Sequence, residues 1–213
     1  MILNEISHYV SEGKTTQIAD LVNRALKEEY PAEKILREGL VAGIMEAEKN
    51  LIINELPGPE IVFAERALNI GLEILNPLLN GSPDPPIGTV ITGTPEGDIR
   101  ETEKKIITVM MQSMGLRVID LGTSIPVIRF IEAAIEEKAR MIICTTSLVT
   151  FLPRMKLLVQ AANQASLKGK TKILICGRPV TVWFSKSVNA DMYSPNPVQT
   201  AEIALEYCKK VIK

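Results

Sequence analysis

The sequence has few of the residues that mark several common classes of protein. In 213 residues there are one histidine, one tryptophan and three cysteines. Cys144, Cys176 and Cys208 are odd in number, widely spaced and embedded in apolar sequence. That pattern is typical of buried thiols in a reducing cytoplasm and argues against disulfides or cysteine metal ligands.

An excess of charge and a long apolar run are also absent. Lys plus Arg is 24 and Asp plus Glu is 25, so the net charge of −1 gives no electrostatic case for nucleic acid. No apolar run approaches the ~20 residues that cross a bilayer. The start, MILNEISHYV, lacks the basic residues and long apolar stretch of a signal peptide. We therefore expect a cytoplasmic protein without nucleic-acid or membrane partners.

The first 80 residues have the spacing of helices. Apolar residues recur at helical intervals in four segments, near 2–10, 18–26, 32–45 and 60–79, with Pro31 at the start of the third. Four helices with short connections predict a helical bundle over residues 1–80. The turn-rich stretch NGSPDPP at 80–86 then predicts a linker over residues 81–87.

Beyond the linker, strands and helices alternate. Apolar runs predict strands at 89–92, 116–120, 141–145 and 172–176, with a short fifth near Met192 and Tyr193. Helices are predicted at 99–114, 126–138, 152–167, 180–187 and 198–212. This alternation predicts an α/β, Rossmann-like domain over residues 88–213, with a flavodoxin-like doubly wound sheet of five parallel strands. Ligands of such sheets bind at the carboxyl ends of the strands.

The stretch from Gly88 to Lys105 predicts a ligand-binding corner of that sheet. It combines a buried strand, a loop with Gly93 and Gly97, and the start of a helix. We expect Asp98 to be the N-cap of this helix, with Glu101 completing a capping box. A purely structural cap is the plain alternative to a ligand-binding role for Asp98.

The order of a helical bundle, a Pro-rich linker and then GTVITGTPEGDIRETEKKIITVMMQSMGLRVIDLG resembles the corrinoid proteins of methyltransferase systems. The resemblance covers nearly the whole chain and includes LPGPEIVFAERAL, VIDLGTSIP, LPRMK and CGRPVT. It implies a cobalamin cofactor held by the Rossmann-like domain, with the bundle covering its upper face. It also implies two partners, a substrate-specific methyltransferase and a second, methyl-accepting methyltransferase, between which the protein carries a methyl group without turnover of its own.

The chain departs from the three signatures of that family. Members carry an Asp-x-His-x-x-Gly loop whose His binds cobalt, a Ser-x-Leu loop after the third strand and a Gly-Gly pair after the fourth. Alignment with these signatures keeps the Asp and changes most other positions, giving Asp98, Arg100, Glu103, Thr145, Ser147 and the pair Cys176-Gly177.

Arg100 cannot replace the missing histidine as a cobalt ligand. Its guanidinium stays protonated and has no free lone pair for a metal. The only histidine, His8, lies in the first predicted helix and is expected to be an ordinary helix residue. Three outcomes remain open: a corrinoid without a protein ligand, one that keeps its own dimethylbenzimidazole, or a site that has lost corrinoid. We favour retained binding, because the bundle, the linker and the loop lengths survive.

The resemblance also suggests roles for the changed residues. Arg100 is expected to bond a propionamide carbonyl or the tail phosphate, oriented by Asp98; a weak surface ion pair is the alternative. Glu103 and Cys176 should narrow the groove for the nucleotide tail, Thr145 keeps the hydroxyl of Ser, and Ser147 makes an apolar position polar. Other contacts expected in this domain are Gly97, Ile99, Leu148, Thr150, Gly177, Arg178 and Pro195. In the bundle, the resemblance implies a cap over the cobalt that comprises Met45, Leu56, Pro59, Ile61 and Val62. Apolar residues at helical spacing are far more often ordinary core, so this assignment rests on the resemblance alone.

Two other functions fit the same fold. One is a cobalamin sensor, in which the cofactor changes contacts with a partner; no DNA-binding segment is visible in the sequence. The other is a cofactor storage or delivery protein, which does not need catalytic ligation. Transfer of a methyl group to the bound cofactor distinguishes a carrier from both.

Overall fold

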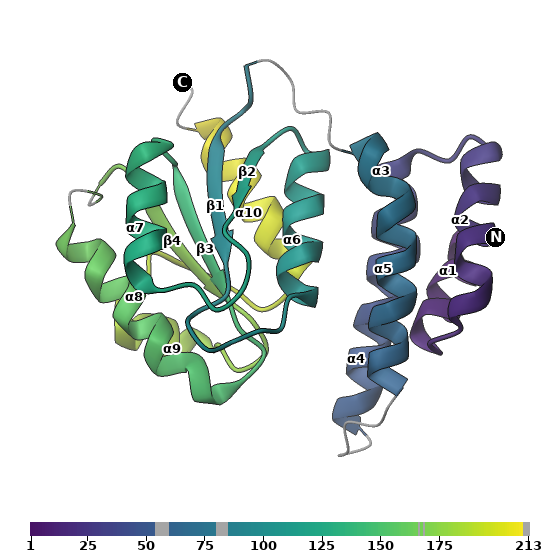
Figure 1. Ribbon diagram of the computed structural model, residues 1–213, viewed down its shortest axis with the longest axis horizontal. Coiled ribbons are helices and arrows are strands. Elements are labelled where there is room, and N and C mark those ends of the chain that lie inside the picture. The colour runs from purple at the N-terminus through teal and green to yellow at the C-terminus, as the bar shows by residue number, and fades with distance from the viewer. Residues whose placement is uncertain (54–59, 80–84, 166, 168, 211–213) are drawn as a thin grey trace. The chain divides into compact units, whose positions relative to one another are not determined.

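A computed structural model describes residues 1–53, 60–79, 85–165, 167 and 169–210 (Figure 1). Contacts between Cα atoms divide the chain into two compact units, Met1–Asn80 and Gly81–Lys213. Most of the predicted linker, along with Leu56 and Pro59, lies outside the described residues. No helix within the described ranges is both long enough and apolar enough to cross a membrane.

The first unit is helical, as predicted. Its helices are α1 (Ile2–Ser11), α2 (Ile18–Lys27), α3 (Ala32–Lys34), α4 (Ala42–Ile53) and α5 (Glu60–Leu79), and a 3-10 turn (Thr15–Gln17) precedes α2. A π-helical stretch, Ile35–Val41, joins α3 to α4, so the predicted third helix is these three segments in succession. Gly71 of α5 allows close packing, because a Cβ there would meet the Leu40 side chain at 2.4 Å.

The second unit contains one parallel sheet of five strands. These are β1 (Thr89–Gly93), β2 (Arg117–Asp120), β3 (Met141–Thr145), β4 (Lys172–Cys176) and β5 (Met192–Ser194). Their order, β2-β1-β3-β4-β5, confirms the flavodoxin-like prediction. The order reverses direction between β1 and β3, and ligands of such sheets generally bind at the carboxyl ends of the strands beside this point.

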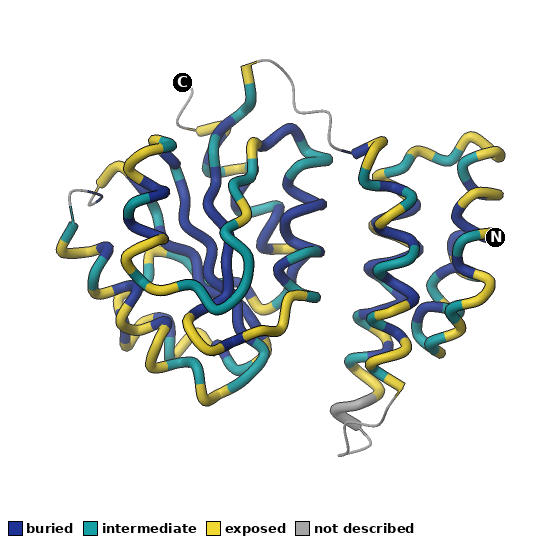
Figure 2. Tube along the Cα trace, in the orientation of Figure 1, coloured by how far each residue is buried: buried dark blue, intermediate teal, exposed yellow. Residues whose placement is uncertain are grey.

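Helices cover both faces of this sheet. They are α6 (Thr102–Ser113), α7 (Val127–Glu136), α8 (Leu152–Gln164), α9 (Val182–Val188) and α10 (Pro197–Lys210). Helices α6 and α10 lie on one face, and α7 and α8 lie on the other (Figure 1). Every residue of β3 is buried, as expected for a central strand covered on both sides (Figure 2).

The start of α6 differs from the prediction. The helix begins at Thr102, its N-cap is Glu101, and no side chain caps it. Asp98 is therefore not the N-cap, and the predicted capping box with Glu101 is wrong. The reason is that the Asp98 carboxylate bonds within its own loop and to the loop after β3. Ile99, predicted in the helix, lies in the loop with its side chain 77% exposed.

Candidate functional site at the carboxyl ends of the strands

Three loops meet where the central strands end. The loop after β1 spans residues 94–101, the loop after β3 begins at Thr146, and the loop after β4 begins at Gly177. The strands are buried along their length, whereas several residues of these loops are exposed (Figure 2). This edge of the sheet is therefore the candidate site.

Asp98 joins the first two of these loops. It is 1% exposed, and its Oδ2 accepts a hydrogen bond from Thr146 Oγ1 at 2.5 Å. Its Oδ1 accepts from the backbone amide of Arg100 at 3.1 Å. A buried carboxylate with two donors is a fixed structural element. Asp98 therefore locks the β1 loop against the β3 loop.

The expected pairing of Asp98 with the side chain of Arg100 takes a different form. The contact is to the Arg100 backbone, and the structure shows no ion pair between the two side chains in the part of the chain that it describes. Arg100 itself is exposed. Its guanidinium is thus available to an external acceptor.

Thr146 was missed in the sequence analysis, which assigned the retained hydroxyl to Thr145. The run Thr145-Thr146-Ser147 places three hydroxyls in succession, and spacing alone does not tell which one faces Asp98. The structure assigns them different positions. Thr146 bonds the Asp98 carboxylate, and Thr145 ends β3 on a face of the sheet.

Three small polar side chains form a row across the sheet. In the strand register Thr145 is beside Cys176, and Cys176 is beside Ser194. All three are no more than 2% exposed. Because Cys144 packs with α7 and α8, its neighbour Thr145 faces the other side, under α6 and α10. The row therefore lies on the face of the sheet that α6 and α10 cover. We take it as the floor of the nucleotide groove that the sequence analysis predicts.

Thr145 has an unused hydrogen-bonding group in this row. Its Oγ1 is buried and has no hydrogen-bond partner among the described residues. The Cys176 sulfur beside it is at most a weak partner. Buried hydroxyls are rarely left unsatisfied, because their desolvation is costly. A polar ligand atom in this groove would satisfy Thr145.

Cys176, which the sequence analysis aligns with a family glycine, is fully buried. Burial raises the pKa of its thiol far above the ordinary value. The thiol therefore stays protonated and does not supply a thiolate to a metal. A second effect on this pKa comes from the charge of Glu103, so the carboxylate of Glu103 lies near the groove.

Gly177 is required by the crossing of two loops. Its φ is +120°, and an added Cβ would lie 1.9 Å from the carbonyl oxygen of Thr146. The amide of Thr146 also donates to the carbonyl of Cys176 at 3.3 Å. Gly177 thus allows the loops after β3 and β4 to lie in contact.

The other expected residues of the Rossmann-like unit occur at the same edge. Ile99, Thr150, Arg178 and Pro195 are exposed, as is Gly97, whereas Glu103, Ser147 and Leu148 are half-buried. In the helical unit Met45 and Ile61 are half-buried, and Val62 is 60% exposed. No group of three metal-ligating side chains occurs in the described part of the chain.

Both units match known domain families. Residues 88–193 match a B12 binding domain, and residues 2–76 match a second model, also described as a B12 binding domain. The chain is 31% identical over 206 residues to dimethylamine corrinoid protein 1 of Methanosarcina acetivorans, covering 96% of each chain. It is 30% identical over 206 residues to the dimethylamine corrinoid protein of Methanosarcina barkeri, again covering 96% of each.

Solved structures support the same fold. The monomethylamine corrinoid protein of Methanosarcina barkeri matches with a TM-score of 0.81 and 24% identity, over 96% of this chain and 97% of that one. A chain of the methanol:cobalamin methyltransferase complex of the same organism matches with a TM-score of 0.54 and 18% identity, over 100% and 84% of the two chains.

Proposed function

Because this chain belongs to the family of B12-binding corrinoid proteins, we propose that it carries a methyl group on cobalamin between partner methyltransferases, with no histidine beneath the cobalt. Membership of the family rests on both units, since the two B12-binding matches together extend from residue 2 to residue 193. The cofactor is cobalamin. When bound, its cobalt accepts a methyl group from one partner and gives it to another.

The residues at the carboxyl edge fit this cofactor. The observation that carries the proposal is the buried Thr145 hydroxyl, which is left without a partner on the groove floor. We assign to it a hydrogen bond with the nucleotide tail. Glu103 and Cys176 are both larger than the glycines with which the sequence analysis aligns them, and we expect them to narrow the same groove. The nucleotide tail should then be held more tightly, or through other atoms, than in family members with glycine at these two positions.

Arg100 is the second contact in the proposal. It follows the fixed Asp98 and is exposed, so that its guanidinium can reach a ligand outside the loop. A planar cation with several donors suits a propionamide carbonyl or the tail phosphate. Since it has no free lone pair, Arg100 binds the periphery of the cofactor and leaves the lower face of the cobalt without a protein ligand.

The partner enzymes belong to the proposal as well. The relatives named above are dimethylamine corrinoid proteins, and one similar fold occurs in a methanol:cobalamin methyltransferase complex. We assign to this chain one methyltransferase that supplies the methyl group and another that accepts it. Within the helical unit, Met45, Ile61 and Val62 are our candidates for apolar contacts with the cofactor.

A visible spectrum tests cofactor binding directly. The purified chain is incubated with hydroxocobalamin and freed from unbound cofactor. A retained corrin spectrum is expected, and its band positions show whether dimethylbenzimidazole occupies the lower face. A colourless protein would show that Glu103 and Cys176 close the groove, and the proposed function would fall.

A second measurement distinguishes a carrier from a sensor or a storage protein. The cobalamin-loaded chain is reduced and mixed with a methylamine-dependent methyltransferase and its substrate. Methylation of the bound cofactor is expected for a carrier. A cofactor that stays bound and unmethylated with every methyl donor would support a sensor or a store.

A further inference from the structure

The loop after β2 runs along the loop that carries Asp98 and Arg100. We call residues 121–125 the bracket. The amide of Ile125 donates to the Thr94 carbonyl at 3.0 Å, and the Thr94 amide donates to the Gly122 carbonyl at 3.3 Å. The two loops therefore continue the pairing of β1 and β2 beyond the ends of both strands.

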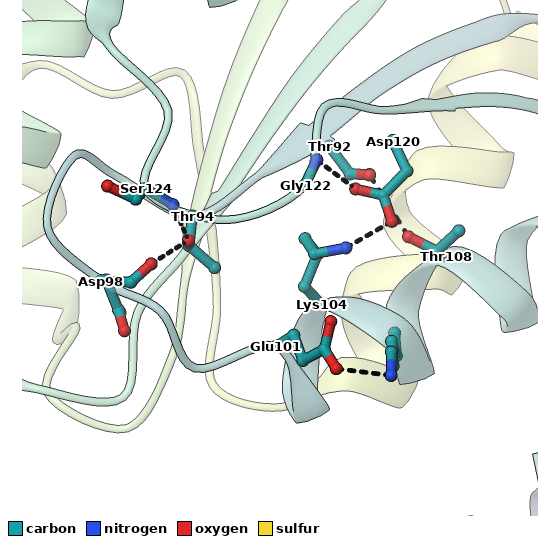
Figure 3. A network of polar contacts seen from close by, with 10 residues as sticks. Thr92, Thr94, Asp98, Glu101, Lys104, Thr108, Asp120, Gly122 and Ser124 are labelled. Atoms are coloured by element: carbon teal, nitrogen blue, oxygen red, sulfur yellow. Dashed lines mark hydrogen bonds and ion pairs between the residues drawn. The ribbon is translucent and has the colours of Figure 1, made fainter. Parts of the chain in front are cut away.

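Ser124 makes the contacts of the bracket that lie nearest to the site. Its amide donates to the Asp98 carbonyl at 2.9 Å and to Thr94 Oγ1 at 2.9 Å. Its Oγ accepts from the Gly97 amide at 3.0 Å. Figure 3 shows Ser124 beside Thr94 and Asp98. One residue thus bonds both Gly97 and Asp98, and Arg100 follows two residues after Asp98.

The backbone of Ser124 is held in an unfavourable conformation. Its φ is +56°, in the left-handed region that residues other than glycine, asparagine and aspartate seldom adopt. Such a conformation persists only where the surrounding contacts fix it, and such residues gather at functional sites. Here the contacts that fix it are those to the loop after β1, residues 94–101, which we call the site loop.

An ion pair with a buried lysine anchors the bracket to α6. Asp120, at the end of β2, accepts from the Gly122 amide at 2.8 Å through Oδ1 and pairs with Lys104 through Oδ2 (Figure 3). The Lys104 side chain is 3% exposed. The first turn of α6, the bracket and the site loop are therefore one connected unit.

This connection matters because no protein–metal bond is available to position the site loop. In a chain with a lower histidine, the bond to cobalt would itself hold the loop against the ring. Arg100 offers no such bond, so the position and orientation of residues 97–100 relative to the cofactor depend on protein contacts alone. On one side that contact is Thr146, bonded to the Asp98 carboxylate; on the other side it is Ser124.

We propose that Ser124 is a positioning residue for cobalamin, acting through Gly97 and Asp98 to fix the loop that presents Arg100. The proposal rests on the proposed function for its ligand, although the contact itself is testable without cofactor. Substitution of Ser124 should loosen the loop in the free protein and then weaken the hold on cobalamin. A merely structural serine would loosen the loop in the same way but leave the hold on cobalamin unchanged.

The first test follows amide hydrogen exchange in the cofactor-free chain. Ser124→Ala removes the acceptor of the Gly97 amide and keeps the backbone strain, and Ser124→Gly removes both. Exchange at Gly97 is expected to be roughly fivefold faster in each variant, the effect of one lost hydrogen bond. Ser124→Asn should restore protection, because asparagine tolerates the left-handed region and its side-chain oxygen can accept.

Lys138→Gly is the matched control for strain. Lys138 also has a positive φ, +48°, but it follows α7 at the opposite edge of the sheet. The substitution Lys138→Gly should leave hydrogen exchange at Gly97 unchanged. Protection of Gly97 that is equal in the wild type and in Ser124→Ala would overturn the proposal.

The second test measures the dissociation rate of hydroxocobalamin and its bound visible spectrum. Ser124→Ala and Ser124→Gly should release the cofactor several-fold faster and shift the bands, whereas Ser124→Asn and Lys138→Gly should match the wild type. Faster exchange without faster release would refute the positioning role. A wild-type chain that binds no cobalamin would refute the proposed function instead. The comparison of Gly97 exchange between the wild type and Ser124→Ala would then still show whether Ser124 holds the site loop.

Discussion

At the scale of single residues, the neighbouring hydroxyls of Thr145 and Thr146 have different roles. Thr146 Oγ1 bonds the buried Asp98 carboxylate, and Thr145 Oγ1 is buried without a partner among the described residues. Removing a satisfied hydroxyl and removing an unsatisfied one have opposite effects on stability. The two positions therefore form a natural pair for substitution by valine, which keeps the shape of the side chain.

Thr145→Val should stabilise the free protein by about 1 kcal/mol, because a desolvated hydroxyl is replaced by a methyl group. The same change should weaken cobalamin binding by about 1 kcal/mol, since the nucleotide tail loses its hydrogen bond with the Thr145 hydroxyl. Urea unfolding of the free chain and titration with cobalamin measure the two effects. Thr146→Val is the comparison and should destabilise the free chain by about 1–3 kcal/mol through Asp98. Equal losses of stability in both variants would contradict the assignment of Thr145.

Arg100 occupies the position at which the sequence analysis expects the cobalt-binding histidine of the family. Arg100→His would place an imidazole next to Asp98, with a ring nitrogen that can bind a metal. In the cobalamin-loaded protein, electron paramagnetic resonance of the Co(II) form should then show coupling to a protein nitrogen. The Co(II)/Co(I) potential should fall below that of the wild type, because a donor beneath the cobalt disfavours reduction.

Arg100→Lys is the control for this change, since a protonated ammonium also has no free lone pair. It should keep the wild-type potential. Identical potentials in Arg100→His and the wild type would show that the loop does not present position 100 to the cobalt.

At the scale of elements, the loops after β3 and β4 cross closely at Gly177 and Thr146. Gly177→Ala would force a Cβ to within 1.9 Å of the Thr146 carbonyl at a φ of +120°. Displacement of Thr146 would also disturb its bond to Asp98. We expect a loss of about 2–5 kcal/mol in unfolding free energy, from overpacking and strain together.

Gly122→Ala separates the two contributions. Gly122 also has a positive φ, +93°, but a Cβ there meets no atom within 4 Å. Backbone strain alone should cost about 1–2 kcal/mol. Urea unfolding of both variants gives the comparison, and a loss at Gly177 no greater than at Gly122 would argue against the close crossing.

The elements themselves were largely predictable from sequence. Short apolar runs and helical intervals predicted each strand and each long helix. The signal is clearest in β3, which is buried along its whole length and has a continuous apolar run. The start of α6 was not predictable in this way. Asp98 has the local chemistry of an N-cap, yet Thr146 binds its carboxylate from 48 positions away. Ser124 escaped notice for the same reason, since its partners lie 26 to 30 positions earlier in the chain.

At the scale of the whole molecule, the two units have separate tasks in the proposed function. The polar row, Asp98 and the bracket all belong to the second unit, and the apolar cover is assigned to the first. Cofactor retention should therefore depend mainly on the second unit. The family resemblance implies a cover over the cobalt from the first unit, and we therefore expect access of a partner enzyme to depend on the linker that the sequence predicts over residues 81–87.

Stiffening this linker tests the division of tasks. The double substitution Gly81→Pro and Ser82→Pro extends an existing Pro-rich stretch and should make it a semi-rigid spacer. The visible spectrum and the dissociation rate of cobalamin should stay unchanged. Methylation of the reduced, loaded protein by a methyltransferase should become several-fold slower, because the cover must move to admit the enzyme.

Two comparisons isolate this hinge effect. The double substitution Gly81→Ser and Ser82→Gly keeps the amino-acid composition of a flexible linker and should leave the methylation rate at the wild-type value. Methyl iodide is small enough to reach the cobalt without a protein partner, so its reaction with the reduced, loaded protein should proceed at similar rates in the stiff and flexible chains. Equal slowing with methyl iodide and with the enzyme would locate the barrier at the cobalt itself, and the linker would then have no role as a hinge.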